Sequence, residues 1–147
     1  MAVHRPAVSG YGSLGLAFLG DAVFSLMIRR HLLRDGGRPV EALSRETARY
    51  ACAKAQSTMY YALESRLTEP ELDVMKRGRN AKSRSRPKNA DITDYRRATG
   101  LEALFGWLYL NGETGRAEEL FAICLNCLNI ATEDKDWTSQ ESPNDTE

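Results

Sequence analysis

The sequence predicts an all-α protein, and three observations support this fold class. Apolar residues recur at steps of three and four along most of the chain, and no segment alternates apolar and polar residues as a strand does. The helical segments are separated by glycine, proline, aspartate or asparagine, which are helix-terminating or capping residues. At 147 residues, with 42% hydrophobic and 27% charged residues, the chain has the size and composition of one globular domain.

The N-terminal half predicts one long helix and then a second helical segment. From Leu14 to Leu33 nearly every residue is apolar, so we expect this helix to be buried on most sides. Gly36-Gly37 ends it, and Pro39 stands where a first helical turn tolerates proline. Val40 to Leu67 has helical apolar spacing and could form one helix or two, because no residue fixes a break near Arg49.

A short helix and a basic loop are expected next. Thr68-Glu69-Pro70-Glu71 reads as a capping box with an early proline, and it predicts a helix that ends at about Lys76. The stretch from Arg77 to Ala90 shows no periodicity, which predicts a loop.

The remaining chain predicts two more helices and a tail. Asp91 caps a long apolar helix that reaches Leu110 before Asn111-Gly112, and Glu113 to Ile130 is amphipathic, which completes a domain of residues 1–130. Residues 131–147 hold six acidic residues against one lysine, which predicts a disordered acidic tail of charge −5. The net charge of the chain is zero, so residues 1–130 carry +5, which favours a polyanionic partner.

Several classes of protein are disfavoured by the sequence. The longest apolar stretch, Leu14 to Ile28, is interrupted by glycine and aspartate, and it is too short and too polar to span a bilayer. Residues 1–13 lack the pattern of a secretory leader, and three cysteines cannot close a disulfide framework, so we expect a cytoplasmic protein. Cys124 and Cys127 are three residues apart in an amphipathic segment, where core packing is expected rather than zinc binding.

Two carboxylates stand inside the two most apolar helical segments. Asp21 follows Gly20, and Glu102 lies between two glycines, Gly100 and Gly106. A carboxylate in such a helix must be desolvated, and a helical glycine costs about 1 kcal/mol relative to alanine, so each combination indicates a functional site. Close approach of the two helices at their glycines would place Asp21 opposite Glu102, a pair of hard oxygen ligands suited to Mg²⁺. The residues alone leave open that Asp21 pairs with an arginine or faces solvent, and that Glu102 forms a surface salt bridge.

The basic stretch 76–89 holds seven lysines and arginines and no acidic residue. Such a stretch binds phosphates through charge and counterion release, and with no aromatic residue interleaved it favours a duplex backbone over stacked single-stranded bases. A merely solvated loop is the alternative. The residues expected to bind RNA are Lys76, Arg77, Arg79, Asn80, Lys82, Arg84, Arg86 and Lys88.

Three motifs in order resemble the ribonuclease III family, and most closely its small Mini-III branch. The resemblance spans roughly Leu14 to Leu120. It is carried by Phe18-Leu19-Gly20-Asp21-Ala22-Val23, by Lys76-Arg77-Gly78-Arg79-Asn80-Ala81-Lys82 followed by Pro87-Lys88-Asn89-Ala90-Asp91 and Tyr95-Arg96, and by Leu101-Glu102-Ala103-Leu104 with Gly106.

The resemblance implies a ribonuclease III catalytic-domain helical bundle that works as a homodimer without a separate RNA-binding domain. It implies Mg²⁺-dependent cleavage of double-stranded RNA, in particular of the stem that flanks 23S (large-subunit) ribosomal RNA in its precursor, and a ribosomal protein is a candidate further partner. Asp21 and Glu102 fall on catalytic metal ligands. Ala17 and Thr99 stand where the larger family has two more acidic residues, so the number of bound metal ions is open. Thr99 and Asp91 are candidates for supporting positions beside the metal ligands.

Two other functions are consistent with the sequence. The missing acidic residues at positions 17 and 99 would suit a non-catalytic ribonuclease III-like scaffold that binds RNA or the ribosome, although both Asp21 and Glu102 are present. A helical protein–protein module, whose basic loop meets an acidic partner, is the third alternative.

Overall fold

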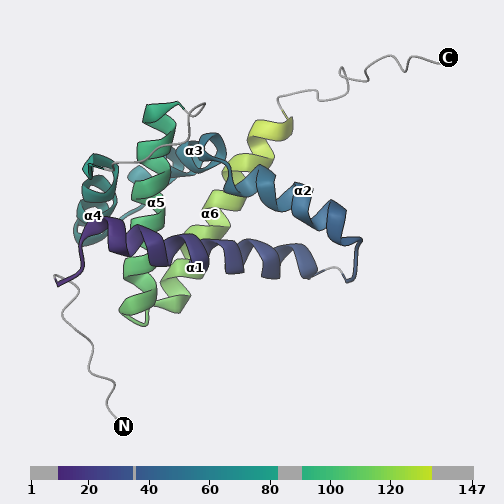
Figure 1. The fold of residues 1–147 in the computed structure, drawn as a ribbon, viewed down its shortest axis with the longest axis horizontal. Helices are drawn as coiled ribbons and strands as arrows, with labels where there is room; N and C mark the ends of the chain where they lie inside the picture. Colours follow the sequence, from purple (N-terminus) through teal and green to yellow (C-terminus); the bar gives the residue numbers. More distant parts are fainter. Residues whose placement is uncertain (1–9, 35, 83–90, 134–147) are drawn as a thin grey trace, which may run out of the picture.

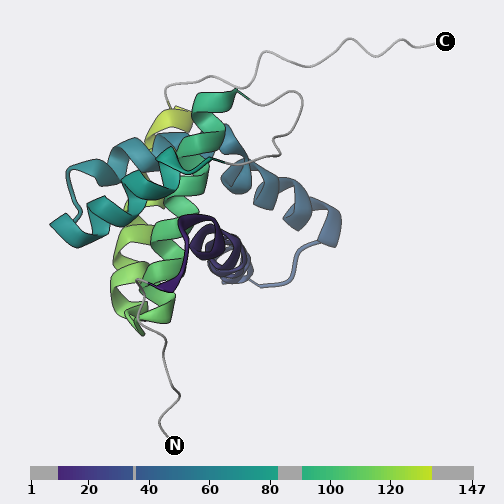
Figure 2. The ribbon, with the colours of Figure 1, turned by 60° about the vertical axis from the view of Figure 1, so that its left-hand side comes forward.

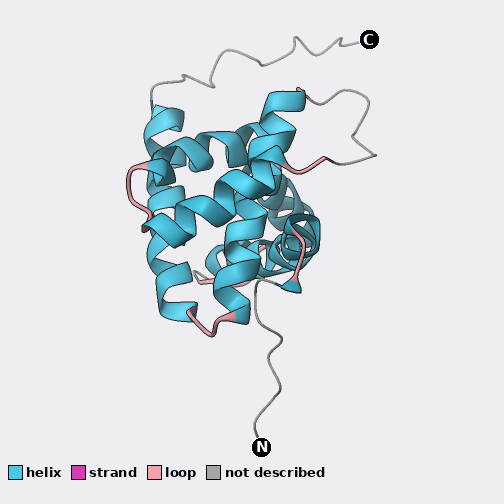
Figure 3. Cartoon of the chain, turned by 90° about the vertical axis from the view of Figure 1, so that its left-hand side faces the viewer, coloured by secondary structure: helices cyan, strands magenta, loops and turns pink. Residues whose placement is uncertain are grey.

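The computed structural model describes residues 10–34, 36–82 and 91–133, which form six α-helices and no strand (Figure 1, Figure 3). The all-α prediction is therefore confirmed. None of the described helices is long and apolar enough to cross a membrane. The helices are α1 (Ser13–Leu33), α2 (Val40–Ala51), α3 (Ala53–Glu64), α4 (Glu69–Asn80), α5 (Ile92–Leu110) and α6 (Thr114–Glu133).

Helix α5 is the centre of the bundle. Helices α1, α3 and α4 all pack on it, α6 packs on α3 and α5, and α2 lies at the periphery against α1 and α3 (Figure 1, Figure 2). The core between α1, α5 and α6 holds Phe24, whose ring meets the rings of Phe105 and Phe121 edge-on at centroid distances of 5.3 and 5.7 Å. This apolar layer fixes how α1 lies on α5, and with it the positions of the carboxylates that the two helices carry.

Glycines bring α1 and α5 into main-chain contact. A Cβ atom added to Gly20 would overlap the main-chain oxygen of Glu102, and one added to Gly106 would overlap that of Leu16. Only residues without a side chain fit at this crossing, which confirms the predicted close approach of the two helices.

The structure decides one helix boundary that the sequence left open and differs from the prediction at another. The segment 40–67 is two helices, because Cys52 is extended (φ −68°, ψ 151°) and separates α2 from α3. The predicted loop is wrong for residues 77–80, which form the last turn of α4. Gly78 explains this turn, because it packs so closely on α5 that an added Cβ atom would come within 2.9 Å of Gly100. This packing stabilises the helical conformation of residues 77–80, where the apolar periodicity has ended.

The predicted N-terminal caps of α4 and α5 are confirmed. Thr68 and Glu71 form the capping box of α4, and Asp91 caps α5 by accepting hydrogen bonds from the main-chain N–H groups of Thr93 and Asp94 at 2.8 and 3.3 Å. The predicted end of the last helix is wrong by three residues, because α6 runs to Glu133 and residues 131–133 of the predicted tail are helical. Residues 134–147, which make up most of the predicted acidic tail, lie outside the described residues.

One face of α1 is exposed, so the prediction that this helix is buried on most sides is wrong. The side chains of Leu14, Phe18, Leu26 and Leu33 are 43%, 85%, 66% and 55% exposed. Their successive spacings of four, eight and seven residues place them along one side of the helix, and we call them the apolar stripe. The sequence shows that this helix is apolar. It does not show that the other helices of the same chain cover only one face of it.

Candidate active site

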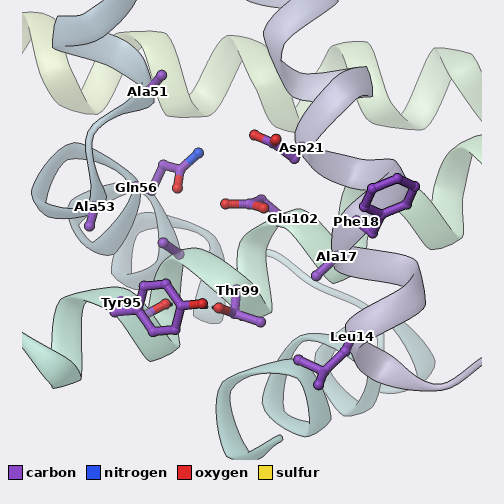
Figure 4. Close-up of a pocket in the computed structure, with 11 residues that line it drawn as sticks. Leu14, Ala17, Phe18, Asp21, Ala51, Ala53, Gln56, Tyr95, Thr99 and Glu102 are labelled. Carbon is purple, nitrogen blue, oxygen red and sulfur yellow. Dashed lines mark hydrogen bonds between the residues drawn. The ribbon is translucent and has the colours of Figure 1, made fainter. Parts of the chain in front are cut away.

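Asp21 and Glu102 line one open pocket of about 350 Å³ between α1, α3 and α5 (Figure 4). Asp21 comes from α1 and Glu102 from α5, and their carboxylates extend into the same space from neighbouring helices (Figure 4). The contact at Gly20 produces this arrangement, because it sets the residue before Asp21 directly against the main chain of Glu102. The other polar residues of the lining are Gln56, Tyr95 and Thr99.

The two carboxylates differ in their exposure to solvent. Asp21 is exposed at the rim, whereas Glu102 is partly buried, so the expectation that both are desolvated holds for Glu102 and is wrong for Asp21. Burial, and secondly the charge of Asp21, raise the pKa of Glu102 to about 8. In the metal-free protein Glu102 therefore keeps its proton near neutral pH, beside an aspartate.

No basic side chain among residues 10–34, 36–82 and 91–133 forms an ion pair with either carboxylate. Neither Asp21 nor Glu102 takes part in any ion pair formed among the described residues, so the alternatives of an arginine partner for Asp21 and a salt bridge for Glu102 are not what the structure shows. A cation is the natural partner for two carboxylates that face each other in this way.

The donor set suits a hydrated magnesium ion. No group of three or more His, Cys, Asp or Glu residues that could hold a metal occurs in residues 10–34, 36–82 and 91–133. Mg²⁺ commonly takes only one or two carboxylates and keeps several waters, so two carboxylates at an open pocket fit it, whereas a site for a fully protein-coordinated metal would need more ligands.

The positions that lack acidic residues face the same pocket. Ala17 and Thr99 both line it, so each shares a helix face with Asp21 or Glu102 respectively. The Thr99 hydroxyl donates to the main-chain oxygen of Tyr95 at 3.0 Å. Asp91 is not part of the lining, and its carboxylate is occupied as the N-cap of α5.

The part of the basic stretch that the structure describes, residues 76–82, lies on the last turn of α4 and just beyond it. Lys76, Asn80 and Lys82 are exposed, Arg77 forms an exposed ion pair with Asp73 at 3.0 Å, and Arg79 donates to the Tyr60 hydroxyl at 3.0 Å. This turn borders the pocket, because Gly78 packs against Thr99 and Gly100 of α5. Arg84, Arg86 and Lys88 lie outside the described residues.

Sequence reasoning missed one polar residue of the pocket, Gln56 of α3. Its side chain is directed toward Glu102 (Figure 4), and the residue is only 3% exposed. A signal was available, because Gln56 precedes the buried residues Met59, Tyr60 and Leu63 by three, four and seven positions and so lies on the buried face of the helix.

The cysteine pair belongs to the core, as predicted. Cys124 is fully buried, and the Cys127 thiol donates to the Cys124 main-chain oxygen at 3.0 Å. Burial raises the pKa values of both thiols, so neither is activated as a thiolate.

The raised pKa of Glu102 makes the stability of the metal-free protein depend on pH. Unfolded Glu102 ionises near 4.5, whereas folded Glu102 holds its proton until about 8. Between these two pH values the folded state therefore binds more protons than the unfolded state. The contribution of the Glu102 carboxyl group to the free energy of unfolding then falls as the pH rises. Because water reaches the pocket, we expect Glu102→Gln to raise the free energy of unfolding by about 2 kcal/mol at pH 8.

Urea denaturation in the presence of a chelator measures this effect. Below pH 4.5 the variant and the unmodified protein should be equally stable, because the carboxyl group is then protonated in both states. An equal gain from Glu102→Gln at both pH values would contradict the explanation. Glu113→Gln, at an exposed position, is the control.

Comparison with known proteins gives one family. The ribonuclease III domain family matches residues 14–113. A Mini-ribonuclease 3 of Brevibacillus brevis is 51% identical over 107 residues, which cover 73% of this chain and 80% of the relative. A Mini-ribonuclease 3 of Thermoanaerobacter sp. is 40% identical over 124 residues, covering 84% and 87%. A crystal structure of a protein from Fusobacterium nucleatum superposes with a TM-score of 0.74 at 30% identity, covering 81% of this chain and 97% of that one.

Proposed function

This chain belongs to the ribonuclease III family, as an endoribonuclease of its Mini-III branch, and from that premise we propose that it cleaves double-stranded RNA with Mg²⁺ held by Asp21 and Glu102. The resemblance seen in the three motifs is thereby confirmed. The observation that carries the proposal is the pair of carboxylates that meet at one open pocket without a basic partner among the described residues.

Each residue of the pocket has a part in this proposal. Asp21 and Glu102 would hold the cation, and Glu102 would release its proton as positive charge arrives. When bound, Mg²⁺ supplies an activated water and stabilises charge on the phosphate that is cut. Ala17 and Thr99 place no carboxylate in the pocket, which leaves room for water around the cation and for the backbone of a duplex.

The basic turn of α4 supports an RNA substrate at this pocket. Lys76, Asn80 and Lys82 are exposed, and the turn packs beside Thr99 of the lining, so phosphates held by it would lie next to the carboxylates. We take the precursor stem of large-subunit ribosomal RNA as the natural duplex, and a ribosomal protein as a candidate assisting partner. Both assignments rest on membership of the Mini-III branch.

Cleavage of a defined stem tests the proposal. The protein is incubated with a uniform RNA duplex, and separately with each single strand, in Mg²⁺ or in excess chelator. We expect discrete cuts in the duplex with Mg²⁺ only. Equal cutting of single strands would contradict the substrate, and undiminished cutting in chelator would contradict the role of the metal.

The apolar stripe of α1 favours a homodimer. Four large apolar side chains are 43–85% exposed, and their contact with water is unfavourable in free energy. A second copy of the chain would cover this face. Phe18 belongs both to the stripe and to the lining of the pocket, so each copy would border the site of the other.

A charge in the stripe should separate the two copies. Leu26 is 66% exposed and does not line the pocket, so Leu26→Asp tests the interface without touching the site. We expect the dimer dissociation constant to rise at least about 100-fold, because each interface then buries two charges. Light scattering should change from twice 16.4 kDa to 16.4 kDa, whereas Tyr61→Asp on α3 should remain dimeric. A monomeric unmodified protein would contradict the dimer.

A further inference from the structure

Gln56 presents to the active-site pocket an amide that no other described residue hydrogen-bonds. The residue is 3% exposed and stands in the first turns of α3, one turn before Met59 and Tyr60, which are fully buried. Within the described part of the chain no hydrogen bond to the Gln56 amide is formed. Every fully enclosed side-chain nitrogen or oxygen there has a partner, so the amide atoms of Gln56 must reach the space of the pocket. Figure 4 shows the amide directed toward Glu102.

Folding alone does not explain a glutamine at this position. No described residue hydrogen-bonds this amide, so its partners can come only from what occupies the pocket, whereas an apolar side chain of equal size would need none. Residues that break a local rule in this way are characteristic of functional sites, where stability is given up for binding.

The other polar groups of the pocket are already engaged. The Thr99 hydroxyl donates to the main-chain oxygen of Tyr95, and Tyr95 has a further interaction. Asp21 and Glu102 together carry up to two negative charges, and a third carboxylate would add to the repulsion that already raises the pKa of Glu102. An amide adds one acceptor and two donors without adding charge.

We propose that the Gln56 amide hydrogen-bonds the water shell of the cation held by Asp21 and Glu102, on the side of the pocket formed by α3. This inference rests on the proposed function, because it assigns a third group to the same metal site. Gln56 thereby supplies a polar contact on a site that lacks carboxylates at Ala17 and Thr99. It anchors cation-bound water where those residues provide no charged ligand.

Binding of Mn²⁺ in the absence of RNA is the test. Mn²⁺ accepts the same oxygen ligands as Mg²⁺, and its binding can be followed by electron paramagnetic resonance. Gln56→Met keeps the length of the side chain and removes the amide, and we expect roughly ten-fold weaker Mn²⁺ binding from it. Its melting temperature should stay equal or rise, which a structural role of the amide would not allow. Unchanged Mn²⁺ affinity, or a lowered melting temperature, would overturn the inference.

A second variant tests the position of the group rather than its removal. Gln56→Glu places a carboxylate at the same distance from the cation, so we expect tighter Mn²⁺ binding, and unaltered affinity would place Gln56 away from the ion. Ser57→Ala is the matched control, because Ser57 is equally buried but its hydroxyl faces Arg97 at 3.4 Å and does not line the pocket.

Asp21→Asn, measured in the same titration, separates the two proposals. If it loses Mn²⁺ binding while Gln56→Met retains it, the role of Gln56 is wrong and the proposed function stands. If Asp21→Asn binds Mn²⁺ as the unmodified protein does, the metal site itself is wrong.

Discussion

Asp21→Asn should cleave duplex RNA at least about 1,000-fold more slowly than the unmodified protein when RNA and Mg²⁺ are saturating. Asparagine keeps the size of the side chain and removes its charge, which leaves Glu102 as the one carboxylate of the lining. A single carboxylate in this pocket cannot balance the charge of a divalent cation. Glu102→Gln should have a comparable effect for the same reason. Single-turnover cleavage of a labelled stem measures the loss.

The same variant should change Glu102 in a way that a folding defect would not. Burial and the charge of Asp21 both raise the pKa of Glu102, so Asp21→Asn removes the second cause, and the pKa should fall from about 8 while staying above 4.5. Carboxyl NMR titration follows this shift. Glu113→Gln, at an exposed residue outside the pocket, should cleave normally. Normal cleavage by Asp21→Asn would remove this residue from the mechanism.

Gly20→Ala should lower the free energy of unfolding by at least about 2 kcal/mol, although alanine favours an isolated helix by about 1 kcal/mol over glycine. The added Cβ would overlap the main-chain oxygen of Glu102, and because that atom belongs to α5 itself, one helix must move off the other. Since a displacement of about 1 Å can cost 100-fold in rate, we expect cleavage to fall by at least that factor.

Gly15→Ala is the matched control for this substitution. It lies in the same helix, and no atom approaches within 4 Å of the Cβ that would be added. There the higher helix propensity of alanine should act alone and stabilise the protein by up to about 1 kcal/mol. Urea denaturation of the two variants gives the comparison, and Gly106→Ala should behave as Gly20→Ala does. Equal stability of Gly20→Ala and Gly15→Ala would contradict the close helix crossing.

Local signals were sufficient for the fold class and for the carboxylate pair. The capping residues Thr68 and Asp91 and the long apolar runs predicted where helices begin and extend. The unusual combination of a glycine beside an acid in two apolar helices predicted that Asp21 and Glu102 meet, and they do line one pocket. Both signals are contained within a few residues of sequence.

What could not be predicted depends on contacts between distant segments. The last turn of α4 is helical because Gly78 packs on α5, and no pattern within residues 77–80 indicates that contact. Large apolar side chains also stand on the exposed face of α1, at the apolar stripe, so periodicity alone could not separate the two faces. Gln56 was missed for another reason: its spacing from Met59 and Tyr60 indicated the buried face, but a glutamine in a helix usually faces solvent.

The central claim is that Asp21 and Glu102 together hold one divalent cation. Crystals grown with Mn²⁺ test it most directly, because anomalous scattering locates the ion without assumptions about its ligands. We predict one strong peak between the two carboxylates, within direct coordination distance of at least one of them, and its loss in crystals of Asp21→Asn. An anomalous peak elsewhere on the protein, with an empty space between Asp21 and Glu102 at Mn²⁺ concentrations that support cleavage, would contradict the claim.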